Sequence, residues 1–267
     1  MTRFFTEVKL PDGIESVQLD GDDARHAREV LRMRPGDRFV LCDGAGRDHG
    51  CVVTSLDRDG VRGRVESVAP NRSEPVYEAV LYQGIPKGDK LDDIVRKAVE
   101  LGAARIVPVA CARSVARWES ADRATAAKVD RLRRIAREAA KQCGRGTVPE
   151  VGEPLGFDAA CREAAAADLA FVPWESERGT SIRSLLTDYT ERRAADPAGR
   201  PRIAFLIGPE GGFDAAEAER AAAAGIRPVS LGRRILRTET AGPAVLAMLT
   251  CLLDEFPDGM VYNESPL

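Results

Sequence analysis

The chain has 267 residues, 44% of them hydrophobic and 30% charged, which is enough for a sizeable core and favours two domains. No run of about 18 apolar residues is present, and MTRFFTEVKL lacks the apolar stretch of a signal peptide. We therefore expect a cytoplasmic protein without a membrane segment. The net charge of −3 does not by itself indicate a nucleic-acid partner, so any such argument depends on local clusters.

The cysteine pattern argues against a disulfide framework or a metal site. The six cysteines are scattered without a CxxC pair, and the chain has only two histidines. We expect reduced and mostly buried thiols, and no bound metal.

The first 70 residues show short alternating runs separated by turn residues. RFVLCD, GCVVTSLD and GVRGRVESVA predict a small antiparallel barrel or sheet. A helix over ARHAREVLRM interrupts these runs, with Asp22 or Asp23 as its cap and Pro35-Gly36 as its end. The composition changes at APNRSEP, residues 69–75, which predicts a linker between a domain at 1–70 and a second at 75–260.

The second part alternates strands with helices. Helix 90–102 places Leu91, Ile94, Val95, Ala98 and Leu101 on one face and ends at Gly102. The polar segment 187–201 is interpreted as a surface loop. This order predicts an α/β fold with a mostly parallel sheet. The other expected strands are 76–84, 104–110, 168–174, 201–208 and 228–232, and the other helices are 128–144, 214–225 and 243–256.

Two loops that follow neighbouring strands carry the chemistry. In LIGPEGGFDAAEAER a strand runs into Gly208 and Gly212, and Asp214 and Glu217 have capping-box spacing before a helix. The glycines either admit a ligand close to the backbone or merely form a tight turn. The loop is neither a Walker motif nor GxGxxG.

The second loop, RRILRTETAGP, carries three arginines before the last helix, with Thr240 as a possible cap and Pro243 near the first turn. Together the two loops suggest a pocket for a cofactor and an anionic substrate at the carboxyl ends of the strands.

Basic residues cluster between positions 123 and 145 and again around the first helix. Each cluster is either a solvated helix face or a surface that contacts RNA phosphates. His26 lies in the basic first helix, where a role on the helix surface competes with RNA contact. The candidate RNA-binding residues are Arg25, His26, Arg28, Arg32, Arg131, Arg134, Arg145 and Arg233.

Several motifs together resemble the RsmE family of ribosomal RNA uridine-N3 methyltransferases, part of the SPOUT superfamily. They are RFF, HAREVLRMRPGD, KGDKLDDIVRKAVELGAARIVPV, EAAKQCGRGTVPEV, LIGPEGGF and LGRRILRTETA. The resemblance covers nearly the whole chain. It implies an N-terminal PUA-like β-barrel, a C-terminal α/β domain with a trefoil knot, and a homodimer that acts on 16S RNA of the small ribosomal subunit, at uridine 1498 in the customary bacterial numbering.

The resemblance also implies S-adenosyl-L-methionine as the methyl donor, bound among three segments of the second domain. The cofactor-binding candidates are Phe171, Pro173, Trp174, Glu175, Leu206, Ile207, Gly208, Pro209, Gly211, Gly212, Ser230, Leu231, Gly232, Ile235, Leu236 and Thr238.

The catalytic candidates are Arg237, Glu210 and Glu239. Arg237 would stabilise the charge that develops on the uracil, and Arg233 and Arg234 would bind flanking phosphates. Glu210 or Glu239 would act as a base or would anchor its loop, and we favour anchoring for Glu210. The alternatives are a SPOUT enzyme that methylates another nucleotide, a non-catalytic ribosome assembly factor and a conventional Rossmann enzyme.

Overall fold

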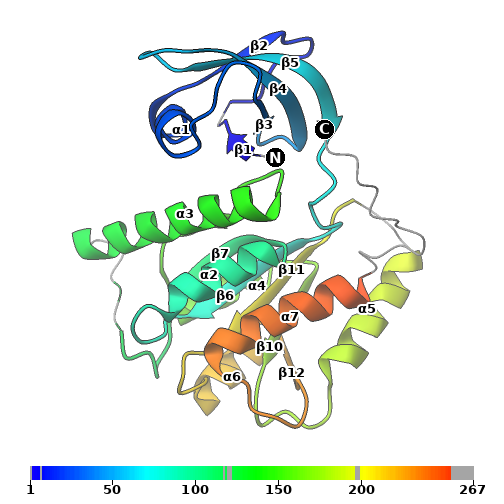
Figure 1. The fold of residues 1–267 in the computed structure, drawn as a ribbon. Helices are drawn as coiled ribbons and strands as arrows, with labels where there is room; N and C mark the ends of the chain where they lie inside the picture. The colour runs from blue at the N-terminus through cyan, green and yellow to red at the C-terminus, as the bar shows by residue number, and fades with distance from the viewer. Residues whose placement is uncertain (1, 7, 117, 119–121, 196–198, 254–267) are drawn as a thin grey trace. The chain divides into compact units, whose positions relative to one another are not determined.

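The computed structural model describes residues 2–6, 8–116, 118, 122–195 and 199–253 (Figure 1). The chain forms two compact units. Among the described residues, unit 1 contains 2–74 and 140–148, and unit 2 contains 75–139 and 149–253. Sequence analysis assigns the returning segment 140–148 to the second domain, because nothing in its own pattern distinguishes it from the basic helix before it.

Unit 1 is built on a five-stranded sheet in the order β1-β3-β4-β5-β2. The pairings among β2 to β5 are antiparallel, as the alternating runs predict, but β1 pairs in parallel with β3. Phe4 and Phe39 meet edge to face at 5.8 Å in its core. The elements are β1 (Thr2–Phe5), β2 (Ser16–Leu19), α1 (Gly21–Arg25), η1 (His26–Val30), β3 (Arg38–Cys42), β4 (Arg47–Leu56) and β5 (Val61–Pro70).

The helical segment of unit 1 differs from the prediction at both ends. It begins at Gly21 with Asp20 in the N-cap position, and no side chain caps it, so Asp22 and Asp23 lie in its first turn instead. It continues as the π-helix η1 and stops before Arg32, whose φ of 52° is left-handed. The helix therefore ends earlier than Pro35, because this backbone conformation cannot continue a right-handed helix.

Unit 2 is an α/β unit whose strand pairings are all parallel, which confirms the predicted fold class. The order is β12-β10-β11-β6-β7-β8, and β9 also pairs with β7. Its strands are β6 (Glu78–Gly84), β7 (Ala103–Ala110), β8 (Glu150–Val151), β9 (Leu155–Gly156), β10 (Leu169–Pro173), β11 (Arg202–Ile207) and β12 (Arg227–Val229). Its helices are α2 (Lys90–Glu100), α3 (Arg123–Cys143), which ends in unit 1, α4 (Phe157–Ala164), α5 (Ile182–Ala195), α6 (Ala215–Ala223) and α7 (Thr238–Leu252).

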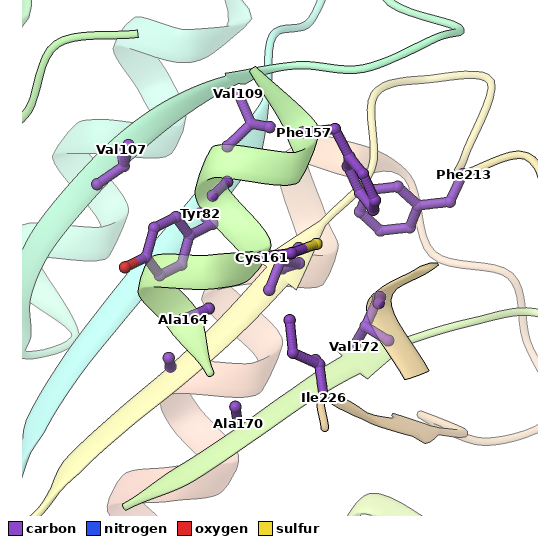
Figure 2. Packing of buried hydrophobic residues seen from close by; sticks show 14 of the residues in the cluster. Tyr82, Val107, Val109, Phe157, Cys161, Ala164, Ala170, Val172, Phe213 and Ile226 are labelled. Atoms are coloured by element: carbon purple, nitrogen blue, oxygen red, sulfur yellow. The ribbon is translucent and has the colours of Figure 1, made fainter. Parts of the chain in front are cut away.

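Each face of this sheet buries one alternating set of side chains. Tyr82, Val107 and Val172 pack with α4, whose first residue Phe157 lies 5.6 Å from Phe213, ring centre to ring centre (Figure 2). On the opposite face Phe171 stacks on Phe205 with their ring centres 5.7 Å apart, and α7 comes close to Leu81 at Gly242. A core on both faces fixes the strand ends, which is what positions the loops beyond them.

Several predicted boundaries in unit 2 differ from the structure: α3 begins at Arg123 and not at 128, β12 ends at Val229 and not at 232, and two further differences change an interpretation. Residues 187–195, expected as loop, belong to α5, because Ile182, Leu185, Leu186 and Tyr189 recur at helical spacing and are all buried. Helix α7 begins at Thr238 with Arg237 as its N-cap, so Thr240 lies inside the helix and does not cap it. Among the described residues, no helix has both the length and the apolar composition to span a membrane.

The cysteines are free thiols, and four of them are buried. Burial raises the pKa of Cys42 and Cys51 to about 12, so these two remain protonated and unreactive at neutral pH. The prediction of mostly buried, reduced thiols agrees with this placement.

Candidate functional site

A cavity of about 1000 Å³ lies at the carboxyl ends of β10, β11 and β12. These strands are neighbours in the sheet, so the three loops that follow them, 173–178, 207–213 and 230–237, form one wall each. The first turn of α7 and Lys90 of α2 complete the lining. This edge of a parallel sheet is where α/β folds bind ligands.

The glycines of the second loop are needed by the turn itself. A side chain at Gly208 would meet the backbone of Gly212 and Phe213 at 3.0–3.1 Å, and Gly212 has a φ of +65°. At Gly84, the end of β6, a Cβ would lie 2.7 Å from the nitrogen of Pro209. The tight-turn interpretation therefore accounts for Gly208 and Gly212, and the turn brings peptide groups to the cavity wall.

The predicted capping box at the start of α6 is confirmed. Glu217 donates its N–H to the Asp214 carboxylate at 2.6 Å, and the Glu217 carboxylate accepts the N–H of Asp214 at 3.1 Å. The second Glu217 oxygen accepts the N–H of Ala112 at 2.8 Å, so this buried carboxylate also ties the loop after β7 to the glycine-rich loop. Arg113 of the same loop donates to the carbonyl of Gly211 at 2.7 Å.

A buried hydrogen-bond chain joins three segments at the floor of the cavity. The hydroxyl of Thr238 donates to the carbonyl of Gly208 at 2.7 Å and accepts from the amide nitrogen of Gln83 at 2.9 Å. Both Thr238 and Gln83 are buried. This chain connects the end of β6, the glycine-rich loop and the start of α7, and it explains why a threonine follows Arg237.

Glu210 is engaged by the start of α2. Both of its carboxylate oxygens accept the backbone N–H of Lys87, at 3.1 and 3.2 Å, and Lys90 Nζ lies 3.0 Å from its Oε1. Burial by itself would raise the pKa of Glu210, but the hydrogen bonds and charge from Lys90 and the backbone outweigh it and lower the pKa. Glu210 is therefore a carboxylate held in place, which fits anchoring better than proton abstraction.

Three arginines beside the cavity differ from Glu210, because their side chains have no charged partner among the described residues. Arg233, Arg234 and Arg237 are exposed, and none forms an ion pair within the part of the chain that the structure describes. Ile235 between them is 87% exposed. An exposed group of guanidinium donors around an apolar side chain offers charge and contact area to an anionic molecule.

Comparisons with known proteins agree with this geometry. A family described as RNA methyltransferase domain matches residues 72–250, and one described as RNA methyltransferase PUA domain matches 19–66. The ribosomal RNA small subunit methyltransferase E of Bacillus subtilis is 33% identical over 90% of this chain and 93% of its own length. The chain belongs to this methyltransferase E family.

Two further members of the methyltransferase E family support the assignment. That of Mycobacterium tuberculosis is 34% identical over 91% of this chain and 89% of its own. The structure of the Neisseria gonorrhoeae member, bound to S-adenosyl methionine, has a TM-score of 0.80 at 31% identity and covers 94% of this chain and 98% of its own. The predicted family and the fold, SPOUT-type α/β with a PUA-like domain, are thus confirmed, whereas a knotted chain path stays a prediction.

Most of the residues that family resemblance assigns to the cofactor line the cavity. Phe171 and Leu206 do not, because both are fully buried in the two faces of the sheet. The reason is register: they lie inside their strands, one or two residues before the loops begin. Lining residues that sequence analysis missed are Lys90, Ser176, Glu177, Arg178, Phe213 and Ala241. Lys90, Phe213 and Ala241 carried a signal, since they lie within the motifs KGDKLDD, LIGPEGGF and LGRRILRTETA.

The candidate RNA contacts of unit 1 fall into two groups. Arg25, Arg28 and Arg32 lie on or just after the helical segment, where Arg25 pairs with Asp22 and Arg28 donates to the carbonyl of Asp57, and His26 is half-buried. Arg145 is instead 3% exposed, with its guanidinium held by the Glu74 carboxylate at 2.9 and 2.7 Å. We reassign Arg145 to a structural role, because a buried, paired guanidinium cannot reach an RNA phosphate.

The candidates of unit 2 are on its surface. Arg131 on α3 is exposed and pairs with Asp92 of α2. Arg134 on α3 and Arg233 at the cavity are both exposed, and neither forms an ion pair among the described residues. Contact of Arg131, Arg134 and Arg233 with RNA phosphates stays a prediction.

Proposed function

We propose that this protein transfers a methyl group from S-adenosyl-L-methionine to N3 of a uridine in the 16S RNA of the small ribosomal subunit, uridine 1498 in the customary bacterial numbering. The observation that carries the proposal is the cavity at the carboxyl edge of the sheet with three uncommitted arginines beside it. The names of the related proteins support the substrate class, and the cofactor in the Neisseria gonorrhoeae relative supports the methyl donor.

The residues of the cavity fit this cofactor. Ile207, Leu231 and Leu236 provide apolar wall for a flat ring, and the turn at Gly208 and Gly212 exposes peptide groups for polar atoms. The volume of about 1000 Å³ leaves room for a nucleobase beside a molecule of this size. When bound, the cofactor supplies a methyl group activated by its sulfonium.

The chain's own contribution is to orient the uracil and to stabilise its anion. Uracil N3 must lose its proton, and the charge then spreads to O2 and O4. The backbone of Arg237 is held at the N-cap of α7, because Thr238 next to it is anchored in the buried hydrogen-bond chain. A guanidinium that reaches into the cavity from this position stabilises the developing charge. Arg233 and Arg234 bind the phosphates on either side of the target nucleotide.

The two carboxylates of the site take different roles. Glu210 anchors the glycine-rich loop, in accord with its lowered pKa and its bonds to Lys87. Glu239 lies on the same helical turn as Arg237, and its side chain is partly exposed to the cavity. Where a protein group accepts the N3 proton, Glu239 is the candidate.

The rest of the chain assists substrate recognition in this proposal. Residues 1–70 form the RNA-binding PUA-like domain and 75–260 the methyltransferase domain. Two copies form a homodimer that acts in the cytoplasm on small subunits. The exposed arginines of the first helical segment and of α3 contribute contacts to RNA phosphates.

Methyl transfer with product identification tests the proposal. The purified protein is incubated with methyl-labelled S-adenosylmethionine and with either unmodified small subunits or naked 16S RNA, and the product nucleoside is mapped by mass spectrometry. We expect one N3-methyluridine per subunit. A methylated ribose or another base would make it a methyltransferase of different specificity, and absence of both transfer and cofactor binding would make it a non-catalytic assembly factor.

A further inference from the structure

Lys90 is the one residue of α2 that lines the cavity. It faces two carboxylates, one from the glycine-rich loop and one from helix α7. Its Nζ lies 3.0 Å from Glu210 Oε1 in the glycine-rich loop and 3.4 Å from Glu239 Oε2 in the first turn of α7. Its side chain is 35% exposed. One ammonium therefore connects the loop that forms the cofactor wall to the turn that carries Arg237.

This contact differs from an ordinary surface ion pair. An isolated exposed pair contributes roughly 0–1 kcal/mol, because water screens it. Here two carboxylates share one cation, and Glu210 is already fixed by the N–H of Lys87. Without the ammonium, two negative groups would face the same space with nothing between them, and like charges at such a distance repel. Repulsion between Glu210 and Glu239 would then push the glycine-rich loop away from the first turn of α7.

Among the described residues, the same two segments are also joined by the neutral hydrogen bond from Thr238 to Gly208. That bond joins the two segments at the floor of the cavity, away from the side where Lys90 lies. Lys90 adds a second link between them, on the α2 side of the cavity. Arg237 then keeps a constant position relative to the glycine-rich loop.

We propose that Lys90 is a positioning residue, which holds Arg237 in register with the cofactor wall by binding Glu210 and Glu239 together. The inference rests on the proposed function, since it concerns the placement of the group that stabilises the uracil anion. It makes no use of Lys90 as a proton donor or acceptor. A misplacement of about 1 Å in such a site can cost about 100-fold in rate.

The test compares Lys90→Met with Lys90→Arg and with a matched control, Lys97→Met. Lys97 lies on the same helix, is exposed and does not line the cavity, and among the described residues its one ion pair is with Asp93 of its own helix, at 2.7 Å. We expect Lys90→Met to lower kcat by about 10- to 100-fold while the dissociation constant of S-adenosylmethionine changes by less than about threefold. Lys90→Arg recovers most of kcat, because a guanidinium also bridges two carboxylates. Lys97→Met behaves as the unmodified protein.

A second readout does not depend on activity. Amide hydrogen exchange of the peptides covering 205–215 and 233–242, measured without ligands, should be faster in Lys90→Met than in Lys97→Met in both segments. If the unmodified protein methylates no uridine but both segments exchange faster, the proposed function fails and the role of Lys90 stands. Unchanged exchange, or a kcat for Lys90→Met equal to that of the control, would overturn the inference.

A parallel loss of cofactor affinity and kcat, unrelieved in Lys90→Arg, would also overturn it. That pattern would mean that Lys90 contributes to cofactor binding itself and does not act through the placement of Arg237.

Discussion

Arg145 of unit 1 and Arg237 of unit 2 are the same residue type in very different environments. Arg145 is 3% exposed and gives two hydrogen bonds to the Glu74 carboxylate, which also accepts the N–H groups of Gly146 and Thr147. Arg237 is exposed at the mouth of a cavity and has no ion-pair partner among the described residues. The first guanidinium stabilises the protein, and the second remains available to a ligand.

The two arginines differ because a carboxylate lies next to Arg145 and pairs with it, whereas no carboxylate among the described residues pairs with Arg237. A buried guanidinium persists only if its lost hydration is replaced, and Glu74 does this from a position 71 residues upstream. Around Arg237, the carboxylates of Glu210 and Glu239 instead lie 3.0 and 3.4 Å from Lys90. Whether an arginine stabilises the fold or stays available to a ligand therefore depends on which carboxylates the fold brings next to it.

The largest effect is expected from Arg145→Ala. It leaves Glu74 as an unpaired, largely buried charge, so we expect a loss of about 3–5 kcal/mol in the stability of unit 1. Native-state hydrogen exchange of β3 to β5 measures it. The control is Arg25→Ala in the same unit, whose surface pair with Asp22 should contribute less than about 1 kcal/mol. Equal losses in the two variants would contradict a structural role for Arg145.

The charge of Glu74 should make unit 1 sensitive to acid. Burial alone would raise the pKa of Glu74, but hydrogen bonds and charge from Arg145, with the N–H of Thr147, outweigh it and lower the pKa. The stability that this carboxylate contributes is therefore complete above about pH 4.3, its ordinary value, and is lost as the pH falls through the lower folded value. Glu74→Gln should be less stable than the unmodified protein at pH 7, and the gap should narrow towards pH 3. Urea unfolding at several pH values measures the gap, and a constant gap would contradict this account.

A smaller effect is expected at the uncommitted arginines that flank Arg237. Arg234→Ala should weaken RNA binding modestly and reduce the slope of log affinity against log salt by about 0.7–1, because one phosphate contact is lost. Arg96→Ala is the control, since Arg96 is exposed but pairs with Asp93. Titrations at several salt concentrations separate the two variants. The same slope for Arg234→Ala as for the unmodified protein would show that Arg234 touches no phosphate.

The sequence predicts the elements with strong periodicity and strong caps. The apolar face of α2, its end at Gly102 with a φ of +89°, and the Asp214–Glu217 capping box are all local patterns. Loops that follow adjacent parallel strands were expected to meet, and they line one cavity. Local signals and strand order were enough for this part of the site.

Features that depend on distant partners were not predictable. The commitment of Arg145 to Glu74, the bridge from Lys90 to two loops and the hydrogen bond from Gln83 to Thr238 all join residues far apart in the chain. The second half of α5 is polar, so the sequence predicts a loop there. The buried residues that reveal the helix, Ile182, Leu185 and Leu186, lie before that polar segment. Phe171 and Leu206 show a third limit, since a motif does not reveal which of its residues face the core.

The most direct test of the central claim is single-turnover methyl transfer to unmodified small subunits by Arg237→Ala, at saturating S-adenosylmethionine. If Arg237 stabilises the uracil anion, the rate of N3-methyluridine formation should fall by about 100- to 1000-fold, while cofactor affinity and the unfolding midpoint stay unchanged. A rate equal to that of the unmodified protein would contradict the account, and the uncommitted arginine beside the cavity would have no part in the chemistry.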